Sequence, residues 1–77
     1  MFDGFQIIYV EDDASVRSSI VECLQILGFQ VREANDGLQG LQMLGDQRPD
    51  LLVADYLMPG MDGVDLIMQA RKLHPGI

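Results

Sequence analysis

Several features that would point to secretion or to a membrane are scarce or absent in this sequence. Its only cysteine, Cys23, cannot form an internal disulfide, which favours a reducing compartment. The chain does not open on a basic stretch followed by a long apolar one, and no apolar run approaches the length of a membrane span. We therefore expect a soluble, cytoplasmic protein.

Positive charge is also scarce. Five Lys and Arg residues stand against twelve Asp and Glu residues, and the formal net charge is -7. Nucleic acids and anionic membranes are bound through basic faces, so we expect neither of them as a partner of this segment.

Length and composition predict one small globular domain over residues 1–77. The hydrophobic fraction of 48% against 22% charged is typical of a folded chain rather than a disordered one. A chain of 77 residues lies near the lower end of what a single core stabilises without disulfides or metals.

Apolar periodicity predicts three strands that alternate with three helices. We expect strands over residues 5–10, 29–34 and 51–55, each followed by a helix. The first strand is apolar throughout, which is typical of a strand buried on both faces, whereas the second alternates and is expected at an edge.

Capping residues set the expected helix limits. Asp13 can cap a helix over residues 14–27, which Gly28 would end in a left-handed conformation. Asp36 and Gln39 resemble a capping box for a helix that ends near residue 45, and Asp62 can cap a helix that ends near residue 73.

Each expected helix carries an apolar stripe that we assign to the core. The members are Val16, Ile20, Cys23, Leu24 and Leu27 in the first helix, Leu38, Leu41 and Leu44 in the second, and Val64, Ile67, Ala70 and Leu73 in the third. Arg17 is expected to face outward, and His74 to be exposed at a helix end.

The β-α-β-α-β-α order predicts an α/β fold with a parallel sheet and helices on both faces. In the flavodoxin-like version of this fold the strand order is 2-1-3, and ligands bind at the carboxyl ends of the first and third strands. Glu11, Asp12 and Asp55 follow those two strands, whose ends would lie about 5 Å apart. Three crowded carboxylates repel one another, so the pattern indicates a site for a hard divalent metal.

The chain resembles the receiver domain of bacterial two-component response regulators, the CheY-like fold. The matching pieces are the strand and acids over residues 7–13, the Asn35-Asp36-Gly37 turn, the strand and acid over residues 49–55, and the loop over residues 58–63. The resemblance covers nearly the whole chain.

The resemblance implies a role for four residues. Asp55 would accept a phosphoryl group from the phosphohistidine of a sensor histidine kinase or phosphotransfer protein. Glu11 and Asp12 would hold Mg²⁺, with Asp12 as the direct ligand and Glu11 acting through water, and the backbone carbonyl of Leu57 would be a further ligand. Such a domain is a phosphorylation switch rather than a turnover enzyme.

The sequence departs from the family after its third β-α unit. A receiver domain continues with a fourth strand that ends in Ser or Thr and a fifth that carries Lys, and both side chains hold the phosphoryl group. This sequence stops at Ile77, before either of them. We therefore expect a truncated receiver domain that is phosphorylated slowly and that self-associates or swaps segments through its open third strand.

Three other interpretations remain open. An aspartate-nucleophile phosphatase would need a second Asp where this chain has Leu57, and a flavodoxin-like FMN binder would need a phosphate loop where it has three acids. A pseudo-receiver would keep the fold as an interaction module without phosphorylation. The bland alternative for Asp55 is a strand-end acid that merely faces water.

Overall fold

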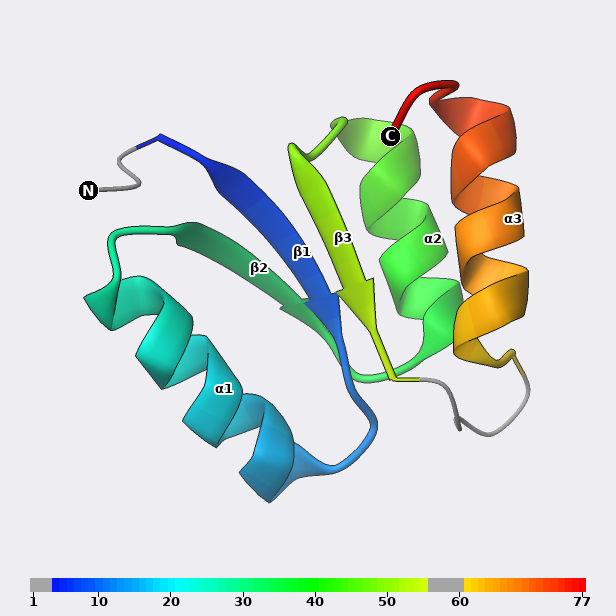
Figure 1. Ribbon diagram of the computed structural model, residues 1–77. Helices are drawn as coiled ribbons and strands as arrows, with labels where there is room; N and C mark the ends of the chain where they lie inside the picture. The colour runs from blue at the N-terminus through cyan, green and yellow to red at the C-terminus, as the bar shows by residue number, and fades with distance from the viewer. Residues whose placement is uncertain (1–3, 56–60) are drawn as a thin grey trace.

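The computed structural model describes residues 4–55 and 61–77, and it confirms the alternation of strands and helices (Figure 1). The elements in chain order are β1 (Gln6–Val10), α1 (Ala14–Ile26), β2 (Gln30–Ala34), α2 (Gly37–Asp46), β3 (Leu51–Ala54) and α3 (Gly63–Leu73). The predicted limits hold to within one residue at each end.

The three strands form one parallel sheet in the order β2-β1-β3, as predicted. The register pairs Val10 of β1 with Ala34 of β2 on one side and with Ala54 of β3 on the other. Helix α1 lies on one face of the sheet, and α2 and α3 lie side by side on the opposite face (Figure 1). The first β-α-β connection runs from β1 to β2, and the second runs back from β2 past β1 to β3, so right-handed connections place α1 and α2 on opposite faces.

The central strand β1 divides the core into two clusters. Ile8 and Val10 face α2 and α3, where they pack with residues such as Leu44 and Leu66, all at most 1% exposed. Ile7 and Tyr9 face α1 and form a second cluster with Val21 of that helix. Since successive side chains of a strand alternate between faces, a strand covered on both sides must be apolar throughout.

The predicted caps hold the ends of the helices. The side chain of Asp13 accepts hydrogen bonds from Ser15 N and Val16 N, and that of Asp62 accepts one from Asp65 N. At the other end of α1, Gly28 has the positive φ of 98° that a left-handed C-terminal residue requires.

The capping box of α2 differs slightly from the expected one. Asp36 Oδ1 accepts a hydrogen bond from Gln39 N at 2.7 Å, as predicted. The Gln39 side chain, however, accepts its bond from Asn35 N at 2.8 Å, one residue before the cap. The first bond satisfies a backbone donor that the helix itself leaves unpaired, and the second satisfies the donor of the residue before the cap.

The predicted helix faces were partly wrong. Residues assigned to the core but exposed in the structure are Val16, Ile20, Cys23 and Leu27 near or in α1, Leu38 in α2, and Val64, Ile67 and Leu73 in α3. In α1 the buried residue is Val21, and in α3 Leu66 and Ala70 turn inward. Each of these helices is apolar around more than one face, so periodicity alone did not decide which face the sheet would cover.

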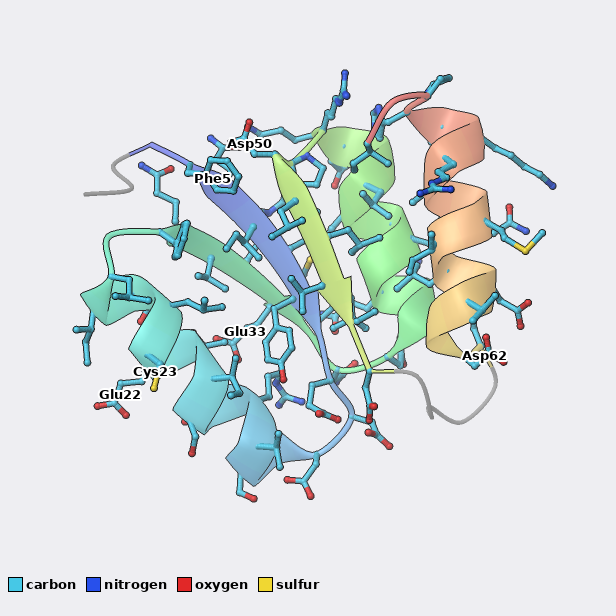
Figure 2. The ribbon with its side chains drawn as sticks, in the orientation of Figure 1. Phe5, Glu22, Cys23, Glu33, Asp50 and Asp62 are labelled. Carbon is cyan, nitrogen blue, oxygen red and sulfur yellow. The ribbon has the colours of Figure 1, made fainter. Side chains whose placement is uncertain are left out.

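The exposure of Cys23 shows this correction most clearly. The thiol was expected in the core, but it lies on the side of α1 away from the sheet (Figure 2). The neighbouring Val21 and the partly buried Leu24 contact the β1 cluster instead.

A close approach between α2 and β1 explains the glycine in the middle of α2. A Cβ atom at Gly40 would lie 2.8 Å from Cγ2 of Val10, closer than real Cβ contacts. The helix therefore gives up some intrinsic helix propensity in order to pack directly on the central strand.

The ends of α2 and α3 are joined by a histidine that was expected to be exposed. His74 is instead half-buried, and its Nε2 lies 2.6 Å from the backbone carbonyl oxygen of Leu44.

Among the residues described, no helix combines the length and the apolar content needed to cross a membrane.

Candidate functional site

Sheet register brings the predicted acids to one place. Val10 and Ala54 are paired, so Glu11 and Asp55 are the next residues of two neighbouring parallel strands. The pairing continues past the strand ends, because Asp55 N donates to Val10 O at 3.1 Å and Glu11 N donates to Ala34 O at 3.1 Å. The backbone of both acids is therefore fixed by the sheet.

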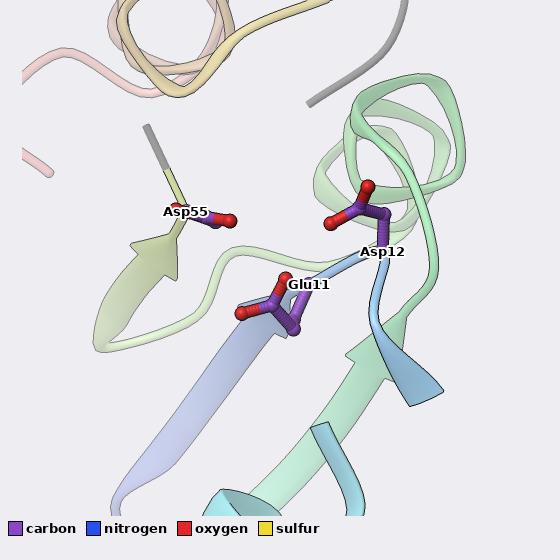
Figure 3. A group of neighbouring side chains, drawn as sticks. All are labelled: Glu11, Asp12 and Asp55. Carbon is purple, nitrogen blue, oxygen red and sulfur yellow. The ribbon is translucent and has the colours of Figure 1, made fainter. Parts of the chain in front are cut away.

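Glu11, Asp12 and Asp55 form a cluster of carboxylates at this edge. One oxygen from each side chain lies within 4.8 Å of the other two. Figure 3 shows the three carboxylates converging from the end of β1 and the end of β3 on a common space. Glu11 is 7% exposed, Asp55 is half-buried and Asp12 is exposed, so the cluster has a buried side and an open side.

The electrostatics of the cluster favour taking up a proton or a cation. Burial raises the pKa of Glu11, and the neighbouring carboxyls of Asp12 and Asp55 raise it further, while a hydrogen bond from Asp13 N opposes them. Burial also raises the pKa of Tyr9, and the charges of Glu11 and Asp55 add to this effect. A bound cation would relieve the same repulsion without protonating the ligands.

The donor set fits a hard divalent cation. All three groups offer carboxylate oxygens, which Mg²⁺ and Ca²⁺ prefer, and Asp12 and Asp55 are open enough for retained water molecules. The fourth predicted ligand, the backbone carbonyl of Leu57, lies outside the described residues.

Asp13 does not belong to the cluster. Its Oδ1 accepts bonds from Ser15 and Val16 of α1, and these bonds hold the pKa of Asp13 below its ordinary value. The third acid of the run is thus occupied as the helix cap, as the sequence predicted.

Sequence reasoning missed the part that Arg17 takes in this site. The side chain is only 18% exposed, and its Nη1 donates to the backbone carbonyl oxygen of Glu11 at 2.8 Å. Its Nε also donates to Glu33 Oε1 of β2 at 3.3 Å. A basic residue in the first turn of a helix, where acids are favoured, was the signal in the sequence.

Comparisons with known proteins identify this arrangement. Residues 7–77 match the family model described as the response regulator receiver domain. The response regulator MprA of Mycobacterium leprae is 42% identical over 67 residues, which are 87% of this chain and 29% of that protein. MprA of Mycobacterium tuberculosis is 41% identical over 66 residues, 86% of this chain and 29% of that protein.

Solved structures agree with the sequence match. The receiver domain of the hybrid histidine kinase CckA is 38% identical, with a TM-score of 0.85 over 91% of this chain and 67% of that one. A CheY-like receiver domain protein of Methanospirillum hungatei is 30% identical, with a TM-score of 0.89 over 94% of this chain and 58% of that one.

The extent of these matches bears on function as well as on family. The chain spans about 29% of the length of the curated relatives named above, so their full activities are not those of this segment alone. The family model nevertheless covers almost the whole chain and includes all three acids of the cluster. This chain belongs to the family of response regulator receiver domains.

Proposed function

We propose that this chain is a phosphoacceptor receiver domain in which Asp55 takes a phosphoryl group from a phosphohistidine. The observation that supports the proposal is the convergence of the Glu11, Asp12 and Asp55 carboxylates to within 4.8 Å at the carboxyl edge of the sheet. The partner is a sensor histidine kinase or a phosphotransfer protein in the cytoplasm.

In this proposal Asp55 acts as the nucleophile. A carboxylate oxygen of Asp55 forms a bond to phosphorus while the phosphorus–nitrogen bond of the phosphohistidine breaks, and the imidazole leaves with the bonding electron pair. The product is an acyl phosphate that stays on the chain, so the domain is a switch and not a turnover enzyme. The backbone bond from Asp55 to Val10 O keeps the nucleophile in place for this attack.

Glu11 and Asp12 would hold Mg²⁺, Asp12 directly and Glu11 through water. The ion supplies charge neutralisation, which lets an anionic phosphoryl group approach the anionic Asp55. The near-complete burial of Glu11 keeps its carboxylate pointing into the cluster, and Asp12 on the open side can exchange protein contacts for water.

Magnesium binding and phosphorylation test the proposal together. Isothermal titration calorimetry should detect Mg²⁺ binding to the wild-type chain and a marked weakening in Asp55→Asn. Asp65→Asn, which removes an exposed carboxylate from α3, is the matched control and should bind like the wild type. Equal binding by all three proteins would show that Asp55 is not part of the ion site.

A small phosphodonor such as acetyl phosphate tests the acceptor itself. Intact mass should show one added phosphoryl group that requires Mg²⁺ and is lost in Asp55→Asn. We expect the yield to be low for this segment, since the Ser or Thr and the Lys of the family are not among its 77 residues. A folded chain that neither binds Mg²⁺ nor reacts would be a pseudo-receiver.

The proposed self-association uses the outer edge of β3. Among the described residues, β3 pairs only with β1, and Leu51 on it is 45% exposed. A shallow apolar groove beside it is lined by residues such as Leu52, Ile67 and Ala70. Two copies related by a twofold axis would pair the β3 edge of one copy with the β3 edge of the other, which closes the assembly as a dimer. Light scattering that finds a well-folded monomer at high concentration would contradict it.

A further inference from the structure

Arg17 links α1 to the end of β1 and to β2 from outside the carboxylate cluster. It lies in the first turn of α1, and its guanidinium reaches back to the end of β1 and across to β2. Figure 2 shows Glu33, its partner on β2, lying between the sheet and α1. One side chain therefore ties together three consecutive elements beside the acidic edge.

The group that Arg17 holds is the peptide between the first two acids. Its Nη1 donates to Glu11 O at 2.8 Å, and this carbonyl belongs to the peptide unit that links Glu11 to Asp12. A peptide unit is planar, so fixing its oxygen also fixes the orientation of the following Cα. Asp12 is exposed on the open side of the cluster, and this backbone contact orients it from outside the cluster.

The other bonds around the turn fix different groups. Glu11 N is held by Ala34 O, and Asp13 N donates to the Glu11 carboxylate at 3.3 Å. Asp13 itself is held as the helix cap. The turn is thus fixed before and after the Glu11–Asp12 peptide, and Arg17 supplies the contact to the peptide itself.

The charge of Arg17 and its hydrogen bond to Glu11 O should affect Mg²⁺ binding in opposite directions, so an experiment can separate them. A guanidinium near the site repels a cation, so its charge alone would weaken Mg²⁺ binding. Its hydrogen bond, in contrast, holds the Asp12 backbone ready for the ion and would strengthen binding. Removing Arg17 therefore changes the affinity in opposite directions under the two explanations.

We propose that Arg17 is a positioning residue for the cation site, acting through the Glu11 carbonyl and anchored by Glu33. The inference rests on the proposed function, since it assumes that the cluster binds Mg²⁺. Its two side-chain bonds go to the Glu11 carbonyl and to Glu33, so its effect on the cluster is carried by the backbone.

Isothermal titration of Mg²⁺ into Arg17→Met, Arg17→Lys and the wild type tests this role. We expect Arg17→Met to bind about fivefold more weakly, which is the effect of one hydrogen bond of ordinary strength. Arg17→Lys keeps the charge that repels the ion but loses the planar pair of donors, so it should also bind more weakly than the wild type. Arg32→Met on β2 removes the same charge from a side chain that makes no bond to Glu11, and it should bind as tightly as the wild type or slightly more tightly.

Unfolding temperatures in EDTA separate positioning from folding. If Arg17→Met loses its helical circular dichroism, Arg17→Lys decides: weaker Mg²⁺ binding at an unchanged unfolding temperature supports the inference. Mg²⁺ binding by a folded Arg17 variant that equals or exceeds the wild type would overturn it. Absence of binding by the wild type would instead overturn the proposed ion site, and this inference with it.

Discussion

Removing the buried acid of the cluster should stabilise the protein without Mg²⁺ and weaken its response to Mg²⁺. The substitution is Glu11→Gln, which preserves the shape of the side chain and an oxygen that can accept the hydrogen bond from Asp13 N. It removes one of three negative charges that lie within 4.8 Å of one another.

Coulomb's law sets the size of the effect. At 4.8 Å, two unit charges repel by about 0.9 kcal/mol in water and by about 3.5 kcal/mol at the effective dielectric constant of about 20 that suits protein sites. Asp12 is exposed and its repulsion is screened, whereas Asp55 is half-buried. We therefore expect Glu11→Gln to raise the free energy of unfolding in EDTA by about 1–2 kcal/mol at neutral pH.

The pH dependence gives an independent check. The pKa of Glu11 is raised in the folded protein above its ordinary value of 4.5, so above that value the folded state binds more protons than the unfolded one. Stability is then highest below the unfolded pKa and falls as pH rises through the folded pKa. Glu11→Gln should lack this decline, and the two proteins should converge in acid. The opposite contribution of Asp13, whose pKa is lowered, is present in both.

Urea unfolding with and without Mg²⁺ measures both effects. Ligand that binds only the folded state stabilises it by about 2.7 kcal/mol at a concentration of 100 Kd. The wild type should gain this stabilisation, and Glu11→Gln should gain less at the same Mg²⁺ concentration. Destabilisation by Glu11→Gln in EDTA at neutral pH would refute the reasoning, because it would mean that the charge is favourable where it lies.

Five further substitutions, two of them controls, test the packing that supports the site, each by urea unfolding. Gly40→Ala should lower the free energy of unfolding by about 1 kcal/mol, because overpacking against Val10 outweighs the gain in helix propensity; Gly45→Ala has free space and should raise it instead. Equal effects at the two glycines would contradict the close approach. Asp62→Ala should cost about 1 kcal/mol through loss of the α3 cap, whereas Asp62→Ser should cost little. His74→Ala should cost about 1 kcal/mol through the lost bond to α2, and no change would show that this bond is unimportant.

The strand order and the site were predictable because both follow from features that the sequence states directly. The fully apolar run that ends at Val10 marks the central strand, and alternation after Gly28 marks an edge strand. In a parallel sheet all carboxyl ends lie at one edge, so an acid after each of two adjacent strands must meet its counterpart. No side-chain detail was needed to bring Glu11 and Asp55 together.

The helix faces were harder to predict, because the sequence offers two apolar stripes where packing uses one. In α3, a stripe through Val64 and Ile67 competes with one through Leu66 and Ala70, and only the second is buried among the described residues. Hydrophobicity ranks the two stripes nearly equally. The choice depends on where α2 lies, which is a tertiary fact that periodicity does not contain.

The contribution of Arg17 was missed for a related reason. A charged residue beside the apolar stripe of an amphipathic helix is normally assigned to water, and Arg17 lies next to Val16, which was assigned to that stripe. Its long side chain instead runs back toward the N-terminal end of α1, the direction in which helical side chains point, and this brings the guanidinium to the end of β1. The start of α1 and the acidic turn therefore form one structural unit. Asp13 caps the helix, and Arg17, one helical turn later, holds the backbone carbonyl of Glu11. A change that shifts the start of α1 should consequently alter the cation site even where all three carboxylates are retained.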